Sequence, residues 1–298
     1  MPAGISYWGF TVLGDSGIET PHDIKPGMKN VLITFAEEPQ QNSYALLAWA
    51  QVDPEDITFV PVSTTSKNAA MLMDGRIDFA LGYHTTPGWY EAEAGPHGLS
   101  WIALDAESDP EGAQRFLEWY PWTSFGIATG GVPSSEGVPM CVNISPYITS
   151  ADTDPELIYR IVKWADENYD RFKDANPWCA AMTIDNLLAW AEENYEPLHE
   201  GAIRYLEEKG LWTDELEARQ QYNVEQMTLW VDAYQTAIDM ADERGITVDP
   251  DNEEWQEFWE DYRDSLGLPL LVYFQGPGKE QPGYYDFYAR WNAAKPKF

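Results

Sequence analysis

Residues 67–86, KNAAMLMDGRIDFALGYHTT, decide the fold that this sequence predicts. The letters predict a helix of small residues, a turn at Asp74-Gly75, a short buried strand over residues 77–81, and then a polar and aromatic loop. In an open α/β sheet, the loop at the carboxyl end of a strand faces the ligand crevice. Tyr83, His84 and Thr85 are therefore candidate ligand-binding residues.

The sequence on both sides of this stretch predicts a βαβαβ unit. Residues 31–36 (VLITFA) form a continuous apolar run, typical of a strand that is buried on both faces, and 57–62 (ITFVPV) form the second strand. Helices are expected over residues 42–51 and 66–73. A further strand is expected over residues 100–104. This alternation predicts a parallel sheet with right-handed crossovers.

Composition limits the classes of function. The chain has 298 residues, 44% of them hydrophobic and 14% aromatic, which is enough for a folded core. Its net charge of −32 repels nucleic acid and anionic membrane surfaces. No apolar segment is long enough to cross a bilayer, and the start, MPAGISYWGF, lacks the basic and apolar regions of a secretory signal. We therefore expect neither a nucleic-acid partner nor membrane insertion.

Motifs for metals, cofactors and nucleophilic catalysis are absent from the sequence. Cys141 and Cys179 are the only cysteines, and neither belongs to a CxxC pair, so no metal site is predicted. We expect both to be buried free thiols, although a single disulfide between them is an open alternative. HExxH, GxSxG and GxGxxG patterns do not occur either. No cofactor is predicted.

The second half of the chain is predicted to be helical. Helices are expected over residues 155–174, behind the N-cap Asp154, and over 183–194. The longest is expected over 216–244, ending at Gly245 as a left-handed cap. Its expected inward stripe has helical spacing: Val224, Met227, Val231, Tyr234, Ile238 and Ala241.

The C-terminal tail has its own character. It begins with an acidic aromatic helix near Trp255 and continues into the Gly/Pro-rich segment QGPGKEQPGYYDFY, residues 275–288. We expect this segment to pack onto the body of the protein or onto a second subunit, which would make the chain a homo-oligomer.

The order of motifs resembles the TAXI family, the TRAP-associated extracytoplasmic solute-binding receptors. The similarity covers residues 24–211 and rests on two motifs and the segment 117–149 between them. One is a DGxIDA-like element and the other an HPGA-x-x-Y-x-x-x-G element; the matching residues are Asp74, Gly75, Ile77, Asp78, His199, Gly201, Ala202, Tyr205 and Gly210.

The resemblance implies an α/β fold of the type II periplasmic-binding-protein kind, with parallel-sheet lobes and a helical C-terminal half. Residues 1–19 would be a partial first-lobe segment and 20–110 the α/β ligand-binding lobe. Residues 111–211 would return to the first lobe, and 212–298 would be a helical and irregular extension. Such receptors capture a small organic molecule, commonly a carboxylate, between two lobes that close by a hinge, and present it to a TRAP membrane permease.

The sequence departs from the family at the loop after residues 31–36. A glycine-rich anion loop is replaced by FAEEPQQNSYA, residues 35–45. Its side chains Gln41, Asn42 and Ser43 keep hydrogen-bonding capacity, and Trp89 adds an aromatic surface. Arginine, the usual clamp for a carboxylate, is scarce here, and Arg76 is expected to be exposed in its turn. These residues favour an uncharged, aromatic or cationic ligand.

Two functions remain open from the sequence. The chain is either a periplasmic or extracytoplasmic receptor, as the resemblance implies, or a cytoplasmic enzyme on the same fold. In an enzyme, His84 or the pair Glu37 and Glu38 would do acid–base work. The sequence does not decide the ligand, the compartment or the oligomeric state.

Overall fold

A computed structural model describes residues 2–175, 177–268, 271, 290–291 and 293–294. The chain divides into two compact units, Ile5–Ser145 and a unit of Met1–Gly4 with Pro146–Ala294. We call them the α/β unit and the helical unit. The division falls at residue 145, later than residue 110, where the sequence analysis ended the α/β lobe. Residues 111–145 belong to the α/β unit because they supply a helix and two strands to it.

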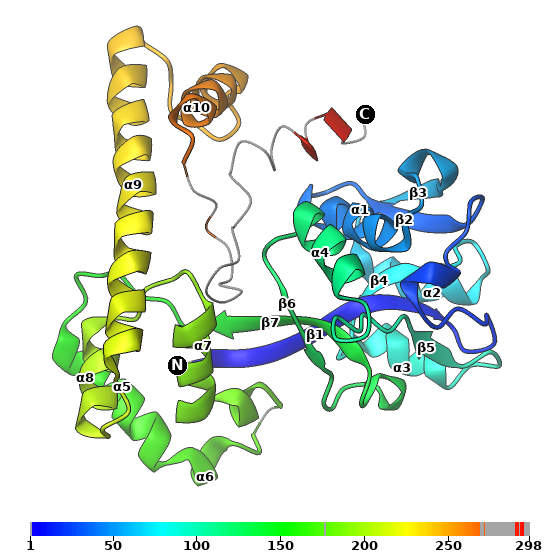
Figure 1. The fold of residues 1–298 in the computed structure, drawn as a ribbon, viewed down its shortest axis with the longest axis horizontal. Helices are drawn as coiled ribbons and strands as arrows, with labels where there is room; N and C mark the ends of the chain where they lie inside the picture. Colours follow the sequence, from blue (N-terminus) through cyan, green and yellow to red (C-terminus); the bar gives the residue numbers. More distant parts are fainter. Residues whose placement is uncertain (1, 176, 269–270, 272–289, 292, 295–298) are drawn as a thin grey trace. The chain divides into compact units, whose positions relative to one another are not determined.

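The α/β unit is built on seven strands and four helices (Figure 1). The strands are β1 (Pro2–Leu13), β2 (Lys29–Ile33), β3 (Thr58–Val62), β4 (Ala80–Tyr83), β5 (Leu99–Trp101), β6 (Ser124–Ile127) and β7 (Pro139–Pro146). The helices are α1 (Glu38–Ala50), α2 (Asn68–Met73), α3 (Pro87–Glu93) and α4 (Pro110–Trp119). The predicted strand–helix alternation from β2 to β4 is present, with boundaries shifted by a few residues.

The strand pairing is mixed. β2 and β3 pair in parallel, with Val31 opposite Val60, as the sequence predicts. β1 runs antiparallel to β4 and to β5, with Phe10 opposite Leu81. The strand predicted over residues 100–104 is therefore β5, and it is antiparallel to its neighbour. A bridge from Asn30 to Phe79 links β2 to the start of β4 in the parallel direction.

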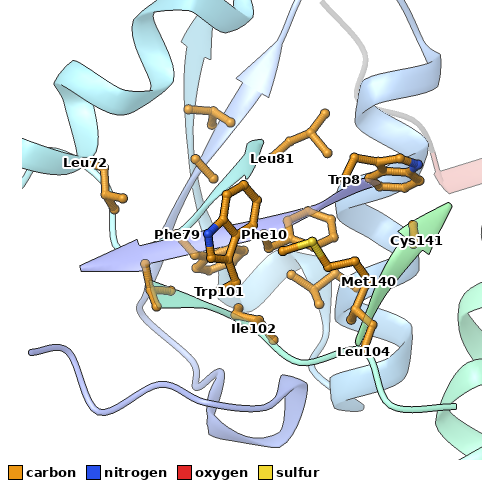
Figure 2. Packing of buried hydrophobic residues seen from close by; sticks show 14 of the residues in the cluster. Trp8, Phe10, Leu72, Phe79, Leu81, Trp101, Ile102, Leu104, Met140 and Cys141 are labelled. Carbon is orange, nitrogen blue, oxygen red and sulfur yellow. The ribbon is translucent and has the colours of Figure 1, made fainter. Parts of the chain in front are cut away.

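One continuous apolar cluster fills the α/β unit. Figure 2 shows Trp8 and Phe10 of β1 among the buried side chains that also come from β4, β5 and β7. β1 is buried on both faces, since the consecutive residues Phe10 and Thr11 both have no exposure, and β4 and β7 pair at its two edges. Cys141 lies in this cluster as a buried free thiol, as predicted, and burial raises its pKa well above the ordinary value. Cys179 is also free but only half-buried, so the structure has no disulfide between the two.

The helical unit contains the remaining helices of the described chain. They are α5 (Pro155–Glu167), α6 (Tyr169–Phe172), α7 (Ile184–Glu193), α8 (Glu200–Glu208), α9 (Asp214–Arg244) and α10 (Glu253–Leu266). The helix predicted over residues 155–174 is split into α5 and α6 at Asn168. Gly245 ends α9 with φ +72°, the predicted left-handed cap. The segment 275–288 lies outside the described residues.

The predicted inward stripe of α9 is wrong at three of its six positions. Val224, Val231 and Tyr234 are exposed, and between residues 231 and 238 the buried positions are Ala233 and Ala237. The reason is the neighbouring helix α10, whose aromatic side chains pack against small residues of α9 around Ala237 and Ala241. Alanine lets those rings approach the helix closely, which a larger side chain would prevent.

Neither a membrane-spanning helix nor a metal cluster is found within the described part of the chain. No helix there combines the length and apolarity needed to cross a bilayer. No group of three or more His, Cys, Asp or Glu side chains there has the arrangement of a metal site.

Candidate functional site

The carboxyl ends of β2 and β3 form a polar edge in the α/β unit. Thr34 directly follows β2, and Ser63 directly follows β3. Both ends lie at the same edge because the two strands are parallel. The Thr34 backbone N–H and hydroxyl both donate to the Val62 carbonyl, at 2.9 and 3.1 Å, which holds the two ends together.

A cavity of about 360 Å³ opens at this edge. Lys67 reaches it from the short 3₁₀ turn Thr65–Lys67 that follows β3, and Arg76 reaches it from the turn after α2. The lining residues are Thr34, Pro61, Val62, Ser63, Lys67, Met71 and Arg76. The lining thus combines two cations and two hydroxyls, and it contains no carboxylate.

Lys67 and Arg76 are two of the few cationic side chains in residues 5–145. The Lys and Arg residues between positions 5 and 145 are Lys25, Lys29, Lys67, Arg76 and Arg115. Arg115 is already occupied, since it donates to the Ala48 and Trp49 carbonyls at 3.1 and 3.2 Å. In residues 5–145, Lys67 and Arg76 form no ion pair. The cavity is therefore a place where positive charge is free to meet an anion.

His84 follows β4 and is buried rather than exposed in its loop. Its Nδ1 lies 3.2 Å from the Gly130 carbonyl, so Nδ1 carries the proton and donates. Its backbone N–H donates to the Tyr7 carbonyl, and its own carbonyl accepts from Val132. Burial lowers the pKa of His84, partly offset by the bond to Gly130. His84 thus joins three segments as a neutral side chain, and its role as a base stays a prediction.

Gln41, Asn42 and Ser43 are all buried on α1. The Ser43 hydroxyl accepts from the Asn30 side-chain amide at 3.1 Å, which fastens α1 to β2. Asn42 Oδ1 is buried without a hydrogen-bond partner among the described residues. None of the three lines the cavity, so their predicted contact with a ligand remains untested.

Glu37 and Glu38 stand at the start of α1 and are exposed. Glu38 Oε1 accepts from the Tyr120 hydroxyl at 2.6 Å. Burial, followed by the charge of Glu38, raises the pKa of Tyr83. The structure therefore brings Glu38, Tyr83 and Tyr120 together, while the predicted acid–base role of the two glutamates stays a prediction.

Trp89 and Thr85 differ in their surroundings. Trp89 is buried beneath Gly82, where an added Cβ would meet the indole at 2.8 Å, and its ring meets Trp101 edge-on at 6.2 Å. Its burial is thus explained by core packing. Thr85 is half-buried in the loop before α3.

Sequence reasoning missed the cavity residues. Ser63 could have been found, because it directly follows the strand predicted over residues 57–62, whereas Thr34 was placed inside the strand predicted over residues 31–36. Lys67 and Arg76 could not, since they are nine positions apart with a helix between them, and only the tertiary fold brings them to one cavity.

Comparison with known proteins gives one family. The family described as "NMT1-like family" matches residues 5–210, about two thirds of the chain. No protein of curated function matches the sequence.

Several solved structures are similar at low identity. The periplasmic aliphatic sulphonate binding protein SsuA from Escherichia coli is 13% identical, with 93% of this chain and 72% of that chain covered and a TM-score of 0.31. A putative periplasmic sulfonate-binding protein SsuA from Methylobacillus flagellatus KT is 20% identical with a TM-score of 0.26, and the match covers only 40% of each chain. The desulfurization enzyme DSZB is 14% identical, with 89% and 79% covered and a TM-score of 0.31.

The predicted fold is confirmed. The structure is of mixed α/β type with a helical C-terminal half, as predicted, and the family match agrees with a periplasmic-binding-protein-like fold. The family match does not single out the TRAP-associated receptors within this broader group.

Proposed function

This chain belongs to the NMT1-like family, and we propose that it is a solute-binding protein that holds a small anionic organic molecule at the carboxyl ends of β2 and β3. The observation that carries the proposal is the cavity lined by Lys67, Arg76 and the hydroxyls of Thr34 and Ser63. Its volume of about 360 Å³ suits a small metabolite.

The chemistry of the lining suits a carboxylate, sulfonate or phosphate group. The Arg76 guanidinium can present two parallel N–H donors to such a group, and the Lys67 ammonium adds a mobile point charge. The hydroxyls of Thr34 and Ser63 can each donate one further hydrogen bond. Apolar atoms of Val62 and Met71 supply a surface for the carbon skeleton.

The strong negative charge of the whole chain does not prevent anion binding. At physiological ionic strength, charges more than about 8 Å apart are largely screened. An anion in the cavity therefore responds chiefly to the two cations beside it, whereas the net charge of −32 acts mainly on approach. The scarcity of arginine in the sequence favoured an uncharged, aromatic or cationic ligand, but Arg76 lines the cavity and supplies an arginine.

The partner and compartment belong to the same proposal. We infer an extracytoplasmic protein that delivers its ligand to a membrane permease of the TRAP type. The motif resemblance at residues 74–78 and 199–210 supports a TRAP permease. The same resemblance implies an extracytoplasmic location, and the two cations of the cavity favour an anionic ligand.

Calorimetric titration of the full chain tests the proposal. The ligands are benzoate, benzenesulfonate and succinate, with benzamide as the neutral analogue of benzoate. We expect at least one anion to bind and benzamide to bind much more weakly. Arg76→Gln should weaken anion binding about 10- to 100-fold, because a hydrogen bond to a charged group contributes about 1.5–3 kcal/mol.

Lys29→Gln is the matched control. Lys29 is an exposed cation at the opposite end of β2, outside the cavity lining, so this variant should bind like the wild type. If Lys29→Gln and Arg76→Gln weaken binding equally, the anion responds only to overall charge and the site assignment is wrong. If no anion binds, the proposed ligand class is wrong.

A further inference from the structure

A second cavity lies within the helical unit and does not depend on the proposed anion site. Its volume is about 560 Å³, and it is lined mainly by residues of α5, α7 and α8 and of the segments 146–153 and 196–199. Most of its lining is apolar, with Ile158, Val162 and Leu187 among the contributing residues. A concave, mainly apolar space of this size is typical of small-molecule sites.

Two N–H donors at this cavity lack partners. Trp190 is 3% exposed, and its Nε1 is buried without a hydrogen-bond partner among the described residues. His199 Nδ1 accepts from the Gly201 backbone N–H at 3.1 Å, so in the neutral ring the proton sits on Nε2. His199 Nε2 is also buried and unpartnered. Buried donors without partners are costly and rare, which points to an acceptor supplied from outside the chain.

The charges of the lining residues limit the chemical class of ligand that this cavity can hold. No Lys or Arg lines the cavity, and the one carboxylate, Glu196, would repel an anion. Burial raises the pKa of Glu196, as expected where water is scarce. A ligand here would be held by apolar contact and by hydrogen bonds to oxygen.

We infer that this cavity binds a neutral, largely apolar molecule that carries an oxygen acceptor, such as a ketone, ester or ether. The acceptor meets the N–H groups of Trp190 and His199, and the hydrocarbon part lies against the aliphatic lining. Tyr147 and Ile148 also line the cavity, and both are well exposed, so they add apolar surface to it.

A second copy of the chain is the other conceivable occupant of this apolar region. The observations favour the small molecule, because both unpartnered donors are buried among cavity-lining residues. A flat contact between two copies would leave these donors without acceptors.

Calorimetric titration with a matched set of probes tests the inference. Acetophenone carries a carbonyl oxygen, ethylbenzene has a similar shape without it, and benzoate is the anionic analogue. We expect acetophenone to bind about 10-fold more tightly than ethylbenzene. We expect benzoate not to bind in this cavity, so the Arg76→Gln variant, whose anion site is weakened, should show no remaining binding heat from a second benzoate site. Trp190→Phe keeps an aromatic ring but removes the donor, so it should reduce the preference for acetophenone about 3- to 10-fold.

Trp164→Phe is the matched control, because Trp164 lies on α5 outside the cavity lining and is exposed. His199→Asn is the second variant; it keeps an oxygen that can cap the Gly201 N–H and removes the imidazole donor. Equal binding of acetophenone and ethylbenzene, no binding of either, or an unchanged preference in both donor variants would overturn the inference. A dimer in sedimentation equilibrium that Ile161→Glu dissociates, together with no acetophenone binding, would assign this region to a second copy instead.

Discussion

The two units treat their large apolar side chains differently. The α/β unit encloses Trp8, Phe10 and Phe116, each at most 1% exposed, within one cluster. The helical unit leaves Ile148 81% exposed and Ile161 51% exposed, and its buried residues fall into separate smaller clusters. The first unit has a filled interior and exposes few large apolar side chains, namely Phe35, Tyr90 and Ile127, whereas the second exposes more of them among the described residues.

This difference explains why the two cavities have opposite chemistry. In the α/β unit the interior is full, so its cavity lies at a strand edge, where loops supply hydroxyls, Lys67 and Arg76. In the helical unit the cavity lies between helices and takes the apolar character of their facing sides. The same chain therefore offers one site suited to an anion and another suited to a neutral molecule.

The largest expected effect concerns the filled core. Phe116→Ala should lower the free energy of unfolding by about 3–5 kcal/mol, because it leaves a cavity among packed rings. Phe116 has Trp8, Trp49 and Phe125 as ring neighbours within 6.3 Å. Ile161→Ala should cost about 1 kcal/mol or less, since half of that side chain already meets water.

Urea unfolding followed by circular dichroism measures both variants. Leu157→Ala, at a second half-exposed position of α5, serves as the control for Ile161→Ala. Similar losses for Phe116→Ala and Ile161→Ala would remove this distinction between the two units.

A smaller effect is expected where a loop folds over His84. Gly131 has φ +76°, and a Cβ added there would lie 2.4 Å from His84 Nδ1. Gly131→Ala should cost about 3 kcal/mol, about 1 for the left-handed backbone and about 2 for overpacking. Gly17→Ala has nearly the same φ, +74°, but open space around the Cβ, so it should cost only about 1 kcal/mol.

Thermal unfolding of the two variants separates these contributions. Equal losses would mean that the loop yields easily around His84. The loop at the carboxyl end of β4 could then change its conformation at little cost in free energy, and a ligand could move His84.

Short sequence patterns correctly predicted those elements whose formation depends on neighbouring residues in the chain. The β2–β3 parallel pair, the start of α5 behind Asp154 and the Gly245 cap follow from apolar runs, an N-cap and a glycine. β1 was missed because GISYWGFTVL shows no simple alternation of apolar and polar residues, and its burial depends on tertiary packing in the apolar cluster.

The candidate site depended on contacts that no local pattern contains. His84 is buried because residues 130–132 fold over it from 46 positions away. Trp89 was predicted to face a ligand, yet its position beneath Gly82 accounts for its burial. Arg76 was set aside as a turn residue, because only the fold shows that Lys67 shares its cavity.

The smallest expected effect is a pair of opposite pH dependences, one in each unit. Burial raises the pKa of Glu196 above 4.5, so the native state holds its proton more firmly than the unfolded state. The stability linked to Glu196 is therefore present below pH 4.5 and is lost as the pH rises. Burial lowers the pKa of His84 below 6.5, so its contribution is present above pH 6.5 and is lost as the pH falls.

Unfolding free energies of Glu196→Gln, His84→Gln and the wild type, measured from pH 4.5 to 8, test this pair. Glu196→Gln should gain on the wild type as the pH rises, and His84→Gln should gain as the pH falls below 6.5. Glu192→Gln changes an exposed carboxylate of α7 and controls for net charge. If both variants drifted in the same direction, the shifts would follow the charge of the whole chain. Opposite drifts would show that local burial, present in both units, sets the ionisation of each group.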